Sequence, residues 1–246
     1  MPGCDACIPH GGMQRGIVSF AVRRVTNACL SATVCFLFVA SLSGQTVSDD
    51  NIRFRYGEAK KGMDTAACPA HTTDISEDSL VVAFFTAANY YPELCGVNIR
   101  LRYGAVKTSM AARPSVGSMF RKRSKRTYFL IVNRRAKSPQ AQLLHEIPFN
   151  ASVGLMGHEL AHVLDYSNRS GWQILCIGIR YLGKNYRRRM ERQTDATAIS
   201  KGLGQPLYDY ARYVIHRSAV GEKYRRYKLT YYMTPEEIRN ALNNTE

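Results

Sequence analysis

The most informative motif of this chain is the pentapeptide His158-Glu159-Leu160-Ala161-His162. In an α-helix, residues four positions apart lie one above the other on the same face. This spacing allows both imidazoles to bind one metal ion, and it brings the Glu159 carboxylate within reach of a water molecule on that metal. Zinc accepts neutral histidine nitrogens, and a catalytic zinc site keeps one coordination position open for water. The motif therefore predicts two zinc ligands, His158 and His162, with Glu159 as the general base.

The residues around the motif favour a helix over about residues 150–166. Apolar side chains recur there at helical spacing, at Val153, Met156, Leu160 and Leu164. We expect Asn150 to cap the helix, and we expect Gly154 and Gly157 to let it lie close to a sheet despite their cost in helix propensity. The alternative is a surface helix with two incidental histidines. A second His-Glu pair, at residues 145–146, has no histidine four residues later and is not expected to bind metal.

A catalytic zinc site needs a third protein ligand, and Glu191 is the best downstream candidate. Glu191 and Asp195 share one face of a helix predicted over about residues 186–202. We expect Glu191 to bind the metal and Asp195 to accept a hydrogen bond from the outer N–H of a ligand histidine, which fixes the tautomer of that ring. Asp195 as the ligand is one alternative. The other is a solvated charged helix in which Glu191 pairs with one of four arginines, Arg187, Arg188, Arg189 and Arg192.

The HExxH motif followed by Glu-x-x-x-Asp resembles the gluzincin branch of the zincin metallopeptidases. Residues 194–204, 208–213 and 231–238 further resemble a group of small, poorly characterised bacterial zincin-like proteins, with Lys201 where that group is expected to have arginine. The resemblance covers about residues 97–240. It implies an α+β, zincin-like fold in which a small mixed sheet packs on the active-site helix and the C-terminal half is helical. It also implies that zinc binding and general-base catalysis belong to His158, His162, Glu191 and Glu159.

Two segments are predicted to form strands of the core. Residues 97–103 alternate apolar and polar side chains, which indicates a half-buried strand, and residues 126–133 contain an apolar run typical of a fully buried one. Between them, residues 109–114 or 115–120 could form an edge strand. In the zincins that the chain resembles, an edge strand lies along the active-site helix and binds extended peptide, through backbone groups that a sheet edge leaves unpaired. The alternative is an ordinary surface hairpin, and residues 80–90 could be either a strand or a short helix.

The C-terminal half is predicted to be mainly helical. Residues 171–183 are apolar and are expected to pack in the core, with a lid or an interfacial patch as alternatives. The last helix is expected to begin at Thr234, because Thr234, Pro235 and Glu237 match the N-cap, N1 and N3 positions of a capping box. A tetrahedral intermediate needs a hydrogen-bond donor besides zinc. We expect this donor after the third ligand, where gluzincins often place it, with His216 preferred over Tyr208, Tyr210 and Tyr213.

Residues 1–44 have the features of a secretory signal peptide. Basic residues precede a short apolar stretch at 28–42, and small residues follow it. The stretch is shorter than the roughly 20 residues of a spanning helix, although an uncleaved anchor is an alternative. We therefore expect a leader at 1–44, an N-terminal extension with the first core elements and one strand near 52–56 at 45–96, and a zincin-like domain at 97–246. The protein is expected to be periplasmic or secreted.

Three cysteines lie outside the predicted leader. In an oxidising compartment Cys68 and Cys95 could form a disulfide, which leaves Cys176 without a partner. Cys176 belongs to the apolar run of residues 172–179, so we expect it to be a buried thiol.

The chain is strongly basic, with 34 lysines and arginines against 19 acidic residues among its 246 residues. The excess is clustered at residues 121–126, 187–189 and 223–228, which favours contact with an anionic surface, but no nucleic-acid-binding module is visible. The sequence as a whole predicts a zinc-dependent metallopeptidase acting on a peptide or protein substrate. The alternatives are a zinc-binding envelope or assembly protein without turnover, and a basic polyanion-binding protein in which HExxH is accidental.

Overall fold

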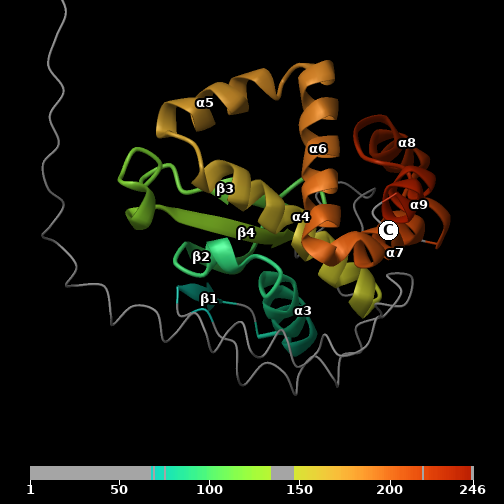
Figure 1. Cartoon of the computed structure of the whole chain (residues 1–246), viewed down its shortest axis with the longest axis horizontal. Helices are drawn as coiled ribbons and strands as arrows, with labels where there is room; N and C mark the ends of the chain where they lie inside the picture. Colours follow the sequence, from blue (N-terminus) through green and yellow to red (C-terminus); the bar gives the residue numbers. More distant parts are fainter. Residues whose placement is uncertain (1–67, 69, 75, 134–146, 218, 245–246) are drawn as a thin grey trace, which may run out of the picture. The chain divides into compact units, whose positions relative to one another are not determined.

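A computed structural model of the chain describes residues 68, 70–74, 76–133, 147–217 and 219–244 (Figure 1). These residues belong to one unit, Thr46–Glu246. Within them the chain has a mixed α+β architecture with a small four-stranded sheet, which confirms the expected fold class at this coarse level. The expected leader at 1–44, the expected strand near 52–56 and the His-Glu pair at 145–146 lie outside the described residues.

The sheet contains β1 (His71–Thr73), β2 (Asn98–Gly104), β3 (Met110–Pro114) and β4 (Thr127–Asn133). Their spatial order is β1-β2-β4-β3, with the first three strands parallel and β3 antiparallel to β4. Alternate side chains of β2 and β4, among them Ile99, Leu101, Tyr128 and Leu130, are fully buried in the main hydrophobic core. Both predicted core strands are thereby confirmed.

Among the described strands, β3 is an edge strand of the sheet, as predicted for residues 109–114. The Ser115 N–H donates to the Thr127 carbonyl at 2.8 Å, and the Asn133 N–H donates to the Ser109 carbonyl at 3.0 Å. Along an antiparallel strand, the backbone N–H and C=O groups of successive residues point alternately toward the partner strand and away from it. The peptide groups of Met110, Ala112 and Pro114 therefore face the open edge, where β3 lies beside the helix that carries the HExxH motif.

That helix is α4 (Phe149–Ser167), and its residues from Ala151 to Val163 are buried. It packs against α3 (Asp78–Ala88) and α7 (Gly204–Arg212). The helix confirms the element expected at 150–166, but Asn150 does not cap it. Pro148 occupies the N-cap position, and the Asn150 amide inside the first turn donates to Asp209 Oδ2 on α7 at 2.6 Å. A tertiary partner thus takes the side chain that the sequence pattern assigned to the helix terminus.

Two glycines of α4 allow a close helix–helix approach. A Cβ atom at Gly154 would meet the backbone of Pro206 and Leu207, and one at Gly157 would meet the side chain of Leu203. The predicted close approach is present, but its partner is α7 and the segment before it. The expectation that these glycines face a sheet was wrong.

The other α-helices of the described residues are α5 (Gly171–Arg180), α6 (Lys184–Ala198), α8 (Glu222–Tyr231) and α9 (Pro235–Asn243). Two short 3-10 helices lie at Pro92–Leu94 and Arg123–Lys125. Helix α6 continues into a π-helical segment, Ile199–Leu203, which contains Gly202 at φ 86°, a left-handed conformation that favours glycine. The predicted capping box of α9 is confirmed, since Thr234 and Glu237 exchange side-chain and backbone hydrogen bonds. Residues 80–90, left open above, mostly form helix α3.

Helix α5 does not pack in the core as expected. Ile174 and Ile177 point inward, whereas Trp172 is 69% exposed and Ile179 is 63% exposed. Cys176 is also exposed, so the prediction of a buried thiol was wrong. The predicted core packing of α5 and the predicted burial of Cys176 failed for the same reason. A continuous apolar run does not show whether all sides of a helix are buried or only one. None of the helices in the described part of the chain is long and apolar enough to cross a membrane.

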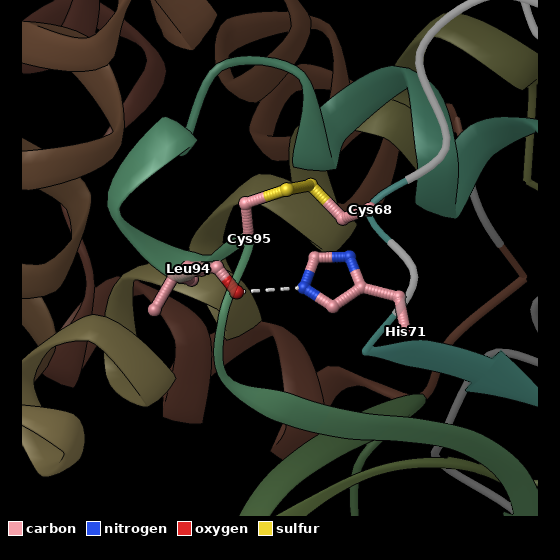
Figure 2. The surroundings of a disulfide bond; sticks show 4 residues. All are labelled: Cys68, His71, Leu94 and Cys95. Atoms are coloured by element: carbon pink, nitrogen blue, oxygen red, sulfur yellow. Dashed lines mark hydrogen bonds between the residues drawn. A yellow bond between two sulfur atoms is a disulfide. The ribbon is translucent and has the colours of Figure 1, made fainter. Parts of the chain in front are cut away.

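The disulfide between Cys68 and Cys95, expected as a possibility from the sequence, joins the segment before β1 to the turn before β2 (Figure 2). Beside it, the His71 ring lies 2.9 Å from the carbonyl of Leu94, through Nε2. Burial lowers the pKa of His71, so the ring is neutral at pH 7 and its Nε2–H is the donor. These two links attach β1 to the rest of the sheet.

Candidate metal centre

Three potential ligand atoms from α4 and α6 meet inside the protein. Glu191 Oε2 lies 3.2 Å from His158 Nε2 and 3.3 Å from His162 Nε2. The three residues are 1%, 3% and 6% exposed, respectively, and together they form a group able to hold a metal ion. Two atoms that each lie about 2.05 Å from a tetrahedral zinc are about 3.3 Å apart. The observed separations therefore fit the edges of a zinc coordination shell.

The outer nitrogen of each histidine ring is held by a hydrogen-bond acceptor. His158 Nδ1 lies 2.7 Å from Asp195 Oδ1, whose partner oxygen accepts from the Met233 N–H at 2.9 Å. His162 Nδ1 lies 3.3 Å from Thr194 Oγ1, and this hydroxyl donates its own proton to the Met190 carbonyl. Both Nδ1 atoms therefore carry the proton in the neutral rings, and both Nε2 lone pairs face Glu191.

A site built in this way can hold a metal ion or a shared proton at its centre. Two nitrogen lone pairs and a carboxylate oxygen all accept hydrogen bonds, and buried acceptors that face one another are unfavourable without a proton or a metal ion between them. Burial lowers the pKa of His158, but the charges and hydrogen bonds of Asp195 and Glu191 outweigh burial and raise it to about 10. Burial raises the pKa of Glu191, and the two imidazoles nevertheless hold it well below its usual range.

The geometry favours Glu191 over Asp195 as the third candidate ligand, and it does not support a solvated ion pair for Glu191. Asp195 faces the outer nitrogen of His158 and not the shared centre, so it occupies the supporting position expected for it. The neighbouring Arg192 donates two hydrogen bonds to Glu237 on α9, at 2.6 and 2.8 Å. Arg187 lies over the ring of Tyr181. Glu191 is therefore a buried partner of the histidines and not a member of a solvated charged helix.

Glu159 connects the HExxH helix to the sheet edge. Its Oε2 accepts a hydrogen bond of 2.6 Å from the backbone N–H of Ala112, one of the peptide groups that face away from β4. The carboxylate therefore lies between α4 and the open edge of β3, one residue along the helix from the first candidate ligand. The sequence placed Glu159 near the metal, but this backbone contact has no signal in a single sequence.

Three tyrosines surround the candidate ligands. The Tyr181 hydroxyl, just after α5, donates to Glu191 Oε1. Tyr166 stacks on His162 with ring centres 6.0 Å apart, and the ring centres of Tyr232 and His158 are 5.4 Å apart. Burial, followed by the negative charge of Glu191, raises the pKa of each phenol, so all three stay protonated at neutral pH. None of the three was predicted from the sequence, although Tyr166 stands four residues after His162, a spacing that places it on the same face of a helix.

The expected transition-state donors have the following surroundings in the structure. His216 is exposed on the π-helical segment Tyr213–Arg217, and the structure gives it no hydrogen bond to another described residue. The Tyr208 hydroxyl pairs with Arg239, and Tyr210 is buried beside Lys228. Tyr213 packs half-buried against the hydrophobic core. Tyr210 also lines a cavity together with His158 and Asp195. Because Tyr166, Tyr181 and Tyr232 contact the candidate ligands directly, they are further candidates for the donor. The preference for His216 stays a prediction.

No known protein family, no curated protein and no solved structure matches this chain. Its function is therefore argued from the geometry of the centre.

Proposed function

We propose that this protein is a zinc-dependent metallopeptidase of the gluzincin type, built on a zincin-like fold. The observation that carries the proposal is the convergence of His158 Nε2 and His162 Nε2 on Glu191 Oε2, at 3.2 and 3.3 Å. Glu159 directly follows His158 on the same helix and binds the backbone of β3. Two imidazoles and one carboxylate are a ligand set typical of catalytic zinc, which keeps a fourth position for water.

The residues around the centre have distinct parts in the proposed reaction. Zinc held by the three ligands would lower the pKa of a bound water to about 7 and polarise a peptide carbonyl. Glu159 takes a proton from the attacking water and delivers it to the leaving amine. Asp195 and Thr194 hold the two imidazoles in the tautomer that leaves Nε2 free. The protonated phenols of Tyr166 and Tyr232 would donate hydrogen bonds to the developing oxyanion.

The open edge of β3 favours a peptide as the substrate. An extended peptide can add a strand to a sheet edge through backbone hydrogen bonds. Because the Ala112 N–H binds Glu159, a peptide lying along Met110–Pro114 would pass close to the general base. The strand thus supports the expected peptide or protein substrate without defining a cleavage preference.

The proposed location is an exported one. Disulfides persist in oxidising compartments, and the Cys68–Cys95 bond supports the periplasmic or secreted location expected from the leader. Of the two alternative functions, an accidental HExxH motif is disfavoured, because both histidine rings are buried and each is held by an outer acceptor. A zinc-binding protein without turnover is the alternative that an activity measurement separates.

The test is hydrolysis of a mixed peptide library by the full, zinc-loaded chain, with products identified by mass spectrometry. Glu159→Gln keeps the ligands but removes the base, so we expect it to retain zinc and to lose about 100-fold or more of the activity. Glu222→Gln, an exposed carboxylate on α8, is the matched control and should keep full activity. Zinc bound without any cleavage by the wild type would favour the non-catalytic alternative, and full activity of Glu159→Gln would contradict the mechanism.

A further inference from the structure

Six large apolar side chains lie exposed on α5, on the turn that follows it and on the loop between β3 and β4. Their exposed fractions range from 40% for Leu175 to 80% for Val116. We call them the α5 patch, and its members are Val116, Phe120, Trp172, Leu175, Ile179 and Leu182. Single exposed apolar residues are ordinary, but a group of this size marks an interaction surface.

The local sequence explains why the patch is continuous. Ile174 and Ile177 occupy the inner side of α5, while residues 172, 175 and 179 recur at the spacing of one outer stripe. Leu182 follows in the turn after the helix. The loop joins this stripe, because the rings of Phe120 and Trp172 meet edge-on at 5.2 Å. Gly171 brings the two segments together, since a Cβ atom there would meet the Met119 carbonyl at 2.7 Å. Figure 1 shows α5 at the upper border of the fold, joined to α6 by a short turn.

The rim of the α5 patch is positively charged. Residues 115–126 contain five lysines and arginines, residues 170–184 contain two more, and neither segment contains an aspartate or a glutamate. Arg126 is buried, whereas the other six basic residues are exposed. The surface therefore combines apolar and aromatic side chains at its centre with cations around them.

We propose that the α5 patch docks on an anionic phospholipid bilayer. A helix that presents aliphatic residues and tryptophan between basic residues can lie in the interface, with its apolar side chains at the headgroup boundary and its cations on the lipid phosphates. Tryptophan prefers this boundary, because its ring is apolar and its N–H is polar. A second copy of this chain is a poorer occupant, because a symmetric contact would bring the two basic rims together.

Docking would place the candidate metal centre close to the membrane. Tyr181 directly follows α5, and its hydroxyl binds Glu191. A membrane-bound α5 would therefore hold the centre near substrates at the bilayer surface. Docking is independent of the proposed peptidase activity, and it can be measured on a chain that cleaves nothing.

Trp172 reports directly on this contact, because it is the single tryptophan of the chain. The full chain is mixed with vesicles of phosphatidylcholine alone or of phosphatidylcholine with phosphatidylglycerol. We expect the Trp172 emission to shift to the blue only with the anionic vesicles, to be quenched by lipids with brominated acyl chains, and to return with high salt. Trp172 is a better readout than vesicle sedimentation, because residues 28–42 are apolar and could bind lipid themselves.

Two variants sharpen the test. Ile179→Ser combined with Leu182→Ser keeps the tryptophan, and we expect it to weaken the vesicle-dependent shift about tenfold or more. Leu229→Ser on α8 removes an exposed leucine outside the patch and should change nothing. The proposal is overturned if anionic vesicles leave the emission unchanged, or if neutral vesicles shift it equally. Shielding of Trp172 without vesicles would also overturn the proposal. Shielding that depends on protein concentration would indicate a second copy on the patch, and shielding that does not would indicate other residues of the same chain.

Discussion

At the residue scale, Asp195 supports the candidate ligand His158 through the outer nitrogen of its ring. Its carboxylate holds the outer nitrogen of His158 at 2.7 Å. We predict that Asp195→Asn weakens zinc binding by about 10- to 100-fold, because the amide neither fixes the ring tautomer as firmly nor adds negative charge. Competition with a chromogenic chelator measures the change.

Asp209→Asn is the control for this substitution. Asp209 is also a helical aspartate that accepts side-chain hydrogen bonds, from Asn150 and Gln205, but it has none from a ligand histidine. Its substitution should leave zinc affinity unchanged. Equal affinities of Asp195→Asn and the wild type would show that the hydrogen bond has no part in metal binding.

The residues of the candidate centre could be brought together from sequence because each pair lies within one helix. His158 and His162, and likewise Glu191 and Asp195, are four residues apart, and helical geometry alone places them on one face. The contacts of Tyr181 and of Ala112 could not be predicted, because they depend on how the chain returns to the site. Asn150 was misassigned for a similar reason, since its partner Asp209 lies far away in sequence.

At the element scale, the contact between α4 and α7 requires a glycine at position 154. An added Cβ would meet the backbone of Pro206, which cannot move as a flexible side chain can. We predict that Gly154→Ala lowers the free energy of unfolding by about 1–3 kcal/mol, because overpacking outweighs the gain in helix propensity.

Gly178→Ala on α5 is the matched control, because its Cβ would meet no atom within 4 Å. There the propensity term acts alone, and we expect a gain of about 0.5–1 kcal/mol. The denaturant midpoints of both variants measure these changes in the free energy of unfolding. If Gly154→Ala is as stable as Gly178→Ala, the close packing of α4 on α7 is wrong.

The ion pair between α6 and α9 predicts a pH dependence. Hydrogen bonds from Arg192 lower the pKa of Glu237 from 4.5 to about 2. An acid whose pKa is lower in the folded state stabilises the fold above pH 4.5, and this stabilisation is lost as the pH falls toward 2. The side chain is partly exposed, so we expect Glu237→Gln to cost only about 1 kcal/mol at pH 7.

Unfolding at several pH values measures this effect. The difference between the wild type and Glu237→Gln should shrink as the pH falls from 4.5 toward 2. Glu236→Gln on the same helical turn is the control, because Arg192 does not bind that carboxylate. A difference that stays constant over this range would mean that the ion pair contributes nothing.

The spacing of apolar residues predicted most helices and strands, but it did not predict which of their faces are buried. Strands β2 and β4 and helices α4 and α9 follow directly from apolar spacing and cap residues. The core packing predicted for helix α5 was wrong, because an apolar helix is equally compatible with the core and with an interface. Helix α8 was not predicted at all. Its buried positions are Tyr224, Lys228 and Tyr231, so it lacks the aliphatic stripe that identifies a core helix.

At the scale of the whole molecule, one covalent bond constrains the N-terminal part of the sheet. The Cys68–Cys95 disulfide closes a segment with a sequence separation of 27 (Figure 2). We predict that replacing both cysteines by serine lowers the free energy of unfolding by about 2–4 kcal/mol, chiefly because the unfolded chain gains freedom. Thermal or denaturant unfolding provides the measurement.

Cys176→Ser is the control for the disulfide, because this thiol is exposed and unpaired in the described chain. Its effect should stay within about 0.5 kcal/mol. The same stability for the double variant and for Cys176→Ser would contradict a native Cys68–Cys95 bond.

The zinc content of the full chain tests the central claim most directly. After dialysis against buffered zinc, elemental analysis should find about one zinc per wild-type chain. His158→Ala should lose the metal, whereas His216→Ala, which removes an exposed histidine outside the centre, should keep it. Wild-type protein without zinc, or equal zinc in the two histidine variants, would contradict the metal centre and the function proposed from it.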